Sequence, residues 1–218
     1  RYVYAHGWTD VDLSTCVPAV PNWRLGTLPK YIMPEQVEKM LCSCRRGTAI
    51  GKRDYAILLL ISRLGLRACE VIRLTLDDLD WHVAEIMVRG KGGRVDRLPL
   101  PEDVGEALAQ YLRDARPASE TRRVFVKARA PVRELGHPST VSTIVRRAIE
   151  RAGLDPAHKG AHLLRHSLAT NMLANGATFA EIGQLLRHQQ TSTTEIYAKV
   201  DIEGLRALAQ PWPMPGGE

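Results

Sequence analysis

The chain has 218 residues, of which 44% are hydrophobic and 25% charged, enough to bury a sizeable core. No apolar run reaches the ~18 residues of a membrane span, and no charged-then-apolar leader opens the sequence, so we expect a cytoplasmic protein without membrane contact. Thirty basic and 24 acidic side chains give a net charge of +6. This balance favours an acidic partner such as nucleic acid, although a mildly basic solvated surface accounts for it equally well.

The four cysteines show no metal-binding pattern. Cys42 and Cys44 form a lone CxC within a helical pattern, and Cys16 and Cys69 stand apart from them. A zinc site needs four ligands at a recognisable spacing, so we expect reduced thiols and no metal. The chain begins at Arg1 rather than Met, which we interpret as the start of a fragment or a processed product.

The N-terminal part predicts an arm followed by helices. Residues 1–28 show little periodicity, so we predict a linker there, a main domain over 29–210 and a tail over 211–218. The turn Pro34-Glu35-Gln36 is typical of a helix start, because proline is tolerated at the first position and the helix dipole favours an acid. The run 52–64 is apolar almost all round and predicts a buried central helix ended by Gly65.

The hydrophobic period then changes. Two short strand-like runs, 84–89 and 94–100, flank Gly90-Lys91-Gly92-Gly93, whose glycines are typical of a hairpin turn. We predict a third strand at 122–127. Helical patterns cover 66–72, 101–115, 139–152, 161–175, 178–187 and 201–209. The predicted fold is therefore mainly α with a small antiparallel β-sheet, an α+β class.

Residues 161–200 concentrate the groups that could act on a phosphate. His162 and Arg165 stand three apart, which places them on one face of a helix. His188 precedes Tyr197 by nine residues. A free tyrosine is only ~0.1% phenolate at neutral pH, so a tyrosine nucleophile needs a base or a positive pocket. A single tyrosine is more often a packing residue, and only the combination indicates phosphoryl transfer.

Upstream residues could complete such a site. Arg67 follows the central helix at its glycine stop, and with Arg165 it could stabilise the charge of a five-coordinate phosphorus. Glu70 could hold Arg67 or an imidazole, or form a structural ion pair with it. Lys91 could donate a proton as general acid, although a hairpin lysine is commonly a solvated residue or a plain phosphate contact. We interpret His166, on another part of the same helix, as structural.

With these motifs the chain resembles the tyrosine recombinase (phage integrase) family over roughly residues 28–205. The matching segments are Arg53-Asp54-Tyr55-Ala56-Ile57-Leu58, Gly65-Leu66-Arg67-Ala68-Cys69-Glu70-Val71, Gly90-Lys91-Gly92-Gly93-Arg94, His162-Leu163-Leu164-Arg165-His166-Ser167 and Leu185-Leu186-Arg187-His188, followed by Tyr197. The order and spacing of the polar positions carry the resemblance.

The resemblance implies a fold like that family's catalytic domain over 29–210 and a set of site residues. The implied catalytic residues are Arg67, Lys91, His162, Arg165, His188 and Tyr197, with Glu70 as the supporting acid. The two arginines would clamp the scissile phosphate and the two histidines would complete its hydrogen bonds. Lys91 would protonate the departing 5′ oxygen, and Tyr197 would form a 3′-phosphotyrosyl link.

The implied function is that of a site-specific DNA recombinase or integrase that cleaves and rejoins strands without a metal or any other cofactor. Phage integration, mobile-element transposition and chromosome-dimer resolution all stay open as its biological role. Double-stranded DNA is the expected partner. We expect a homo- or hetero-tetramer on synapsed DNA sites, and the protein could be a monomer when no DNA is bound. The expected location is cytoplasmic, with the nucleoid. Residues 1–28 would be the linker from an N-terminal DNA-clamping domain. Two alternatives are an inactive DNA-binding architectural protein and a DNA-relaxing enzyme that resembles type IB topoisomerases.

One position departs from the family pattern. The family usually has glycine before the third-motif histidine, and Arg187 stands there in this chain. Arg187 could add a phosphate contact, or it could reposition His188. We include it among the basic candidates for DNA binding. These candidates are Arg45, Arg46, Lys52, Arg94, Arg122, Arg123, Arg146, Arg147 and Arg187.

Overall fold

A computed structural model describes residues 2–11, 29–188 and 193–200. The first of these segments contains only a four-residue helix, α1 (Tyr2–Ala5). Most of the predicted 1–28 linker, the predicted helix at 201–209 and the tail at 211–218 lie outside the described residues. Within the described ranges, no helix combines the length and the apolar character that crossing a membrane requires.

The body is organised around α3 (Ala49–Leu64), the predicted central helix, whose residues Ala56–Ile61 are buried. It begins three residues before the predicted start because the Thr48 hydroxyl caps it and accepts a hydrogen bond from the Gly51 N–H (3.0 Å). It ends at Gly65, whose φ of 60° allows the left-handed turn, as predicted. α3 packs against α2 (Pro34–Cys42), α5 (Glu102–Asp114), α6 (Pro138–Arg151) and α7 (Ala161–Ala174).

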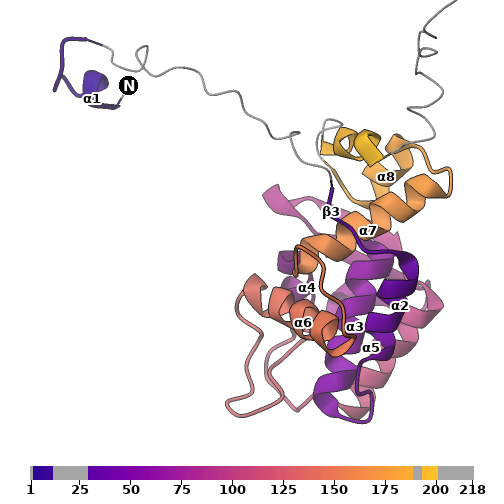
Figure 1. Cartoon of the computed structure of the whole chain (residues 1–218). Coiled ribbons are helices and arrows are strands. Elements are labelled where there is room, and N and C mark those ends of the chain that lie inside the picture. The colour runs from indigo at the N-terminus through magenta and orange to yellow at the C-terminus, as the bar shows by residue number, and fades with distance from the viewer. Residues whose placement is uncertain (1, 12–28, 189–192, 201–218) are drawn as a thin grey trace, which may run out of the picture.

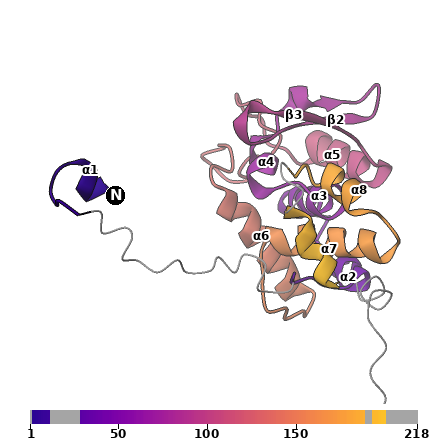
Figure 2. The same ribbon diagram turned by 90° about the horizontal axis from the view of Figure 1, so that it is seen from above.

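The sheet has three antiparallel strands in the order β1 (Leu79–Asp80), β2 (Glu85–Arg89) and β3 (Val95–Pro99). The predicted hairpin is confirmed: β2 pairs with β3 in the register Ile86↔Leu98 and Val88↔Asp96. Ile86, Val88 and Leu98 are buried, so one face of the hairpin covers the core. Figure 2 shows β2 and β3 along one side of the body, with α3 in the middle and α2 at the opposite side.

The predicted third strand at 122–127 is wrong, and its place in the sheet is taken by β1. Residues 122–127 form only isolated bridges, Thr75↔Arg123 and Val126↔Glu134. Val124, Phe125 and Val126 are all buried, which is not the alternation of a half-buried strand. The segment instead pairs with the connection after α4 (Ala68–Arg73), where the Val124 N–H donates to the Leu74 carbonyl (2.9 Å).

The C-terminal elements form a second, smaller core. α7 continues into α8 (Phe179–Leu185), and after residues 189–192 the chain returns as a 3-10 helix, η5 (Glu195–Val200). Figure 1 shows α8 at the upper end of the body, next to α7. The main core surrounds α3, whereas the small tyrosine cluster consists of Ala169, Ile182, Leu186 and Tyr197.

Candidate active site

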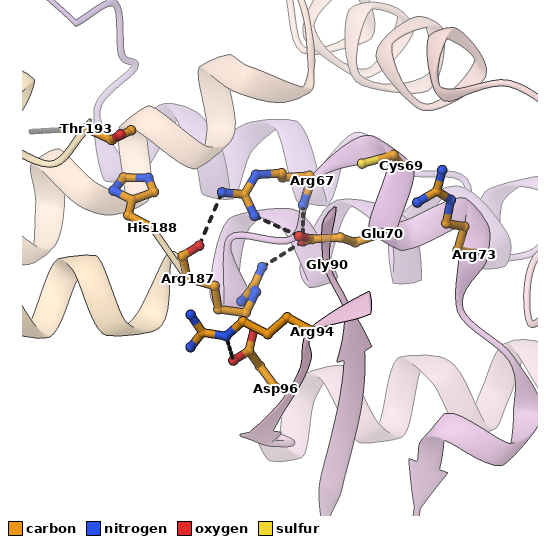
Figure 3. A pocket seen from close by; sticks show the side chains of 10 residues that line it. All are labelled: Arg67, Cys69, Glu70, Arg73, Gly90, Arg94, Asp96, Arg187, His188 and Thr193. Carbon is orange, nitrogen blue, oxygen red and sulfur yellow. Dashed lines mark hydrogen bonds and ion pairs between the residues drawn. The ribbon is translucent and has the colours of Figure 1, made fainter. Parts of the chain in front are cut away.

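An arginine-rich pocket of about 610 Å³ opens between the start of α4, the β2–β3 hairpin and the segment that follows α8. Figure 3 shows its lining, which we call the arginine pocket: Arg67, Cys69, Glu70, Arg73, Gly90, Arg94, Asp96, Arg187, His188 and Thr193. Four arginines face only two carboxylates here, so the pocket favours an anionic occupant. Within the described ranges, His, Cys, Asp and Glu side chains form no group of three or more that could hold a metal ion.

Arg67 enters this pocket as the N-cap residue of α4. Its backbone N–H and its Nη1 donate to the two carboxylate oxygens of Glu70, each at 2.8 Å, and its Nη2 donates to the Arg187 carbonyl at 3.4 Å. The Arg67 side chain is 33% exposed, whereas that of Glu70 is 2% exposed. Glu70 therefore holds one side of the guanidinium from inside the protein and leaves the rest of it toward the pocket (Figure 3).

Glu70 is a buried carboxylate between two guanidiniums. Besides Arg67, it accepts a hydrogen bond from Arg187 Nη2 at 2.7 Å. Burial by itself raises the pKa of this carboxyl, but the charge of Arg187 and the hydrogen bonds from Arg67 outweigh that effect and lower the pKa. The structure thus shows the predicted contact between Glu70 and Arg67 and adds Arg187 as a second partner of Glu70.

Gly65 is the point where the two halves of the site meet. Its carbonyl accepts hydrogen bonds from Arg165 Nη1 and from Arg187 Nη2. A Cβ at this position would lie 2.6 Å from Leu186 Cδ2, and the φ of 60° is unfavourable for other residues. Glycine thus allows the end of α3 to approach the end of α8 closely, and this approach places Arg67 beside Arg165 and Arg187.

Arg165, on α7, is buried at 5% exposure. Its guanidinium spans the two halves of the site, because Nη1 donates to the Gly65 carbonyl and Nη2 to the Leu186 carbonyl. Burial and the neighbouring charges of Arg67 and Arg187 lower the pKa of Arg165 to about 9. The side chain therefore stays protonated at neutral pH and adds its charge to that of Arg67.

Arg187 is buried too, which differs from its prediction as a DNA contact. Its guanidinium donates to Glu70, to the Gly65 and Leu64 carbonyls (3.3 Å each) and to the Leu185 carbonyl (2.9 Å). Its φ is 54°, in the left-handed region, which glycine adopts without strain and which costs a non-glycine residue roughly 1–3 kcal/mol. The hydrogen bonds of the guanidinium offset this strain and use its Nη1 and Nη2 donors, whereas its buried Nε has no partner among the described residues.

The two predicted phosphate-binding histidines lie near these arginines. His188 lines the pocket, and its Nδ1 is 2.7 Å from the Thr194 hydroxyl. Burial, followed by the charges of Arg165 and Arg67, lowers the pKa of His188 to about 4. The pKa of His162 is lowered by partial loss of water and by the same two arginines. Both imidazoles are therefore neutral at pH 7, and each can donate one hydrogen bond to an anion.

Tyr197 is not exposed to solvent in this structure. It belongs to the tyrosine cluster at 1% exposure, and its hydroxyl lies 2.8 Å from His166 Nδ1. The two rings meet edge to face with their centroids 5.6 Å apart. Burial raises the pKa of Tyr197 to about 12, although the charge of Arg165 opposes this increase.

His166, which we interpreted as structural, is the hydrogen-bond partner of the Tyr197 hydroxyl. It stands four residues after His162, and the two ring centroids are 6.4 Å apart on one side of α7. That spacing, which places both imidazoles on the same helix face, was the available signal. Arg73 was also missed, and it lines the arginine pocket.

The hairpin lies beside the pocket as predicted, with Gly90 and Arg94 in the lining. Lys91 begins the short 3-10 turn Lys91–Gly93 at its tip, and Gly92 and Gly93 have positive φ. The Lys91 side chain lies outside the described part of the structure, so its acid role stays a prediction. Arg94 is exposed, and its Nε donates to Asp96 at 2.7 Å.

The other basic candidates lie away from the pocket lining, and several are paired. Lys52 contacts Asp114 (3.4 Å), Arg123 contacts Glu134 (3.5 Å) and Arg146 contacts Glu150 (3.9 Å). The remaining candidates are exposed: Arg45, Arg46, Arg122 and Arg147. Arg46 lies over the Tyr55 ring at 4.8 Å, and Arg122 is paired with Asp77. Their contact with DNA stays a prediction.

Comparison with known proteins gives one consistent result. The family model described as "Phage integrase family" matches residues 30–203. A putative integrase/recombinase of Sinorhizobium fredii, y4rA, is 50% identical over 212 residues, which cover 97% of this chain and 52% of that protein. Tyrosine recombinase XerD of Mycobacterium tuberculosis is 33% identical over 224 residues, covering 95% of this chain and 68% of its own. The chain spans about half the length of the first two curated relatives that it matches.

Solved structures agree in fold. A crystal structure of XerA recombinase superposes with a TM-score of 0.69 at 26% identity and covers 85% of this chain and 67% of its own. XerH site-specific recombinase bound to palindromic difH substrate gives a TM-score of 0.71 at 24% identity over 84% of this chain and 53% of its own. The fold is that of a tyrosine recombinase catalytic domain, and the chain belongs to the phage integrase family.

Proposed function

We propose that this protein is a site-specific DNA strand transferase that cleaves and rejoins DNA through a covalent bond to Tyr197. The observation that carries this proposal is that Arg67 and Arg165 lie close together at the junction around Gly65. Tyr197 is close enough to Arg165 for its charge to oppose the increase in the tyrosine pKa. His162 and His188 lie within the same electrostatic neighbourhood. A phosphodiester at this place would meet two guanidiniums, two neutral imidazoles and one phenol.

Each group then has a chemical task. The Tyr197 oxygen bonds to the phosphorus, which stays attached to the 3′ oxygen of one strand segment. The bond between phosphorus and the 5′ oxygen of the other segment breaks. Arg67 and Arg165 stabilise the additional charge of the five-coordinate phosphorus, each by roughly 3 kcal/mol on the scale of oxyanion-stabilising donors. Lys91 supplies the proton that the departing 5′ oxygen takes. Attack by another 5′ hydroxyl on the phosphotyrosyl bond reverses these steps and joins strands.

In the structure the phenol is buried, whereas the reaction needs it at the phosphate. The bond between Tyr197 and phosphorus therefore requires a limited shift of η5 when DNA binds, one that opens the phenol toward the phosphate and keeps its hydroxyl beside His166. η5 is a single short helix joined to α8 through residues 189–192. Such a shift would loosen the apolar contacts of the small tyrosine cluster but leave the main core around α3 intact.

The proposed substrate is double-stranded DNA at specific sites, and the proposed active form is a homo- or hetero-tetramer on two synapsed duplexes. The net charge of +6 and the excess of arginine in the pocket support an anionic substrate. Related proteins have been solved with DNA, including XerH bound to difH substrate and a Tn1549 transposon integrase in complex with circular intermediate DNA. Such a substrate is compatible with a role in mobile-element transposition and with a location at the nucleoid.

The test is covalent capture. A duplex that carries a site selected from a random-sequence pool for binding is nicked near the cleavage position, so that the short product diffuses away and the phosphotyrosyl adduct accumulates. The wild type is expected to form a denaturation-resistant protein–DNA adduct, and Tyr197→Phe to form none. Tyr55→Phe, on α3, is the matched control and should keep the adduct.

The outcomes separate the alternatives. An adduct that persists in Tyr197→Phe contradicts the assignment of the nucleophile. Site-specific binding with no adduct in the wild type would instead indicate an architectural DNA-binding protein. A protein that forms the adduct and relaxes supercoiled DNA, but never joins strands of two duplexes, would indicate the topoisomerase-like reaction.

A further inference from the structure

The hydroxyl of Tyr197 has one hydrogen-bond partner among the described residues, and it is a base. His166 Nδ1 lies 2.8 Å from the phenol oxygen, and the edge-to-face packing of the two rings fixes their relative orientation. His166 comes from α7 and Tyr197 from η5, so the contact joins two separate elements. The sequence motifs assigned no chemical task to His166.

The surroundings of His166 keep its imidazole neutral. Burial lowers its pKa, and the charges of His162 and Arg165, on its own helix, lower it further. From the segment after α8, His188 faces the same region, and from η5 the facing group is Tyr197. In this contact the neutral imidazole accepts through Nδ1 while the phenol donates its proton. His166 is thus in the required protonation state and in contact with the proton that must leave.

The other two histidines are less suited to this task. The Nδ1 of His188 is occupied by the Thr194 hydroxyl at 2.7 Å. His162 lies one helical turn from His166 and has no hydrogen bond to Tyr197 in the described part of the molecule. Both are close to Arg67 and Arg165, where they can donate to a phosphate.

We propose that His166 is a catalytic residue that removes the proton of Tyr197 as the phenol oxygen bonds to phosphorus, an inference that rests on the proposed function. The proton moves from Tyr197 Oη to His166 Nδ1, the oxygen–phosphorus bond forms, and the 5′ oxygen departs with a proton from Lys91. In the joining step, His166 returns its proton to the phenol. No other reactant is needed.

The buried phenol makes such a base necessary. With a pKa of about 12, only ~0.001% of Tyr197 would be phenolate at pH 7. Transfer to an adjacent neutral imidazole during bond formation avoids the free phenolate, and general bases of this kind typically accelerate reactions by about 10²–10⁴-fold. As His166 takes the proton it becomes a cation beside Tyr197, which favours its own contact with the developing phosphate charge.

The experiment compares two variants by single-turnover cleavage of the nicked substrate from pH 5.5 to 9. His166→Asn keeps an oxygen acceptor near the position of Nδ1 but is not a base, and His166→Phe keeps the aromatic packing without an acceptor. Each is expected to cleave about 10²–10⁴-fold more slowly at pH 7. The wild-type rate should level off with rising pH, whereas the variant rates should keep rising. His158→Asn, in the exposed loop before α7, should match the wild type.

Replacement of Tyr197 by a fluorinated tyrosine distinguishes a base from a packing residue. The lower phenol pKa reduces the need for a base, so it should restore cleavage strongly in His166→Asn and little in the wild type. His162→Asn, on the same helix face, should show no comparable restoration. DNA binding and circular dichroism are measured for each variant to establish that it is folded.

Several results would overturn the proposal. Equal or faster cleavage by both His166 variants would mean that His166 only holds the phenol in its buried position. Slower cleavage with an unchanged pH profile and no restoration by the fluorinated tyrosine would mean a packing role. If wild-type protein formed no adduct at all, the proposed function itself would fail, which is a distinct outcome from an adduct that does not depend on His166.

Discussion

The arginine pocket and the tyrosine cluster are built in opposite ways, although both serve one proposed reaction. In the pocket, guanidiniums are held by a buried carboxylate and by carbonyls at the ends of α3 and α8. In the tyrosine cluster, one phenol is packed among apolar side chains and held by a single histidine. The first arrangement resists displacement because each charge has several partners, whereas the second is held by only one hydrogen bond and a small apolar contact.

This difference explains how the site can be assembled in the absence of DNA while Tyr197 stays unreactive. The proposed phosphate-binding groups are held in place by these contacts, so little reorganisation is needed when an anion arrives. The proposed nucleophile, Tyr197, is instead buried and its pKa is raised to about 12, which would suppress reaction with other electrophiles. Activity would then depend on the substrate, because only bound DNA supplies contacts that could move η5.

The strongest test of the arginine arrangement is Arg165→Lys, which changes the buried guanidinium behind the pocket. A lysine keeps the charge but cannot bridge the Gly65 and Leu186 carbonyls and face a phosphate at once. Cleavage of the nicked substrate should fall by about 10²–10³-fold, the usual loss for one transition-state donor. Arg113→Lys, at an exposed position of α5, is the control and should cleave normally. Similar rates in the two variants would show that Arg165 is only a structural bridge.

Glu70→Gln tests the anchor of the pocket. The change removes the negative charge between Arg67 and Arg187 and leaves a buried guanidinium unpaired, which should lower the free energy of unfolding by about 3 kcal/mol. Urea unfolding measures this loss. Because Arg187→Gly removes both the unpaired charge and a strained φ of 54°, the double variant should be less destabilised than the sum of the two single changes. Additive losses would contradict the coupling.

The pH dependence of stability should have two separate parts. His188 has a folded pKa of about 4, below its ordinary value of 6.5, so the unfolded chain takes up the proton first as the pH falls. This histidine therefore contributes stability that is present above pH 6.5 and is lost progressively as the pH falls toward 4. In His188→Asn the decline between pH 6.5 and 4 should be shallower, as measured by urea unfolding.

Glu70 should contribute below that window. Its folded pKa is lowered from 4.5, so the stability it provides is present above 4.5 and is lost as the pH falls through the folded pKa. Glu70→Gln should remove this part and keep the part that belongs to His188. A single transition that both substitutions change in the same way would contradict the separate assignment.

The smallest expected effect concerns the tyrosine cluster. Tyr197→Phe abolishes the proposed chemistry but removes only one hydrogen bond from the folded protein, with the ring and its apolar contacts retained. The free energy of unfolding should therefore change by about 1 kcal/mol or less. Thermal unfolding without DNA measures it. A loss of unfolding free energy as large as that of Glu70→Gln would show that the tyrosine cluster is held as strongly as the arginine pocket.

Much of the fold follows from local sequence. The helices of the body, the hairpin and the stop at Gly65 were predicted because periodicity, capping and positive φ depend on a few neighbouring residues. The prediction of a strand at 122–127 was wrong because this segment pairs with the distant segment around Leu74 rather than with a neighbour in sequence. Its consecutive buried residues fit more than one structure, and only packing against the body decides among them.

The candidate site divides in the same way. Motif spacing and the family resemblance predicted a set of site residues and showed Arg187 as a departure from glycine. The predicted residues are Arg67, Lys91, His162, Arg165, His188 and Tyr197. The sequence did not predict that Arg187 would turn inward onto Glu70, or that His166 would hold the phenol. Both contacts join residues from distant segments through the approach of α3, α7, α8 and η5. Spacing within one helix determines which side chains share a face, whereas the partner of a buried charge or hydroxyl depends on which other elements pack against that face.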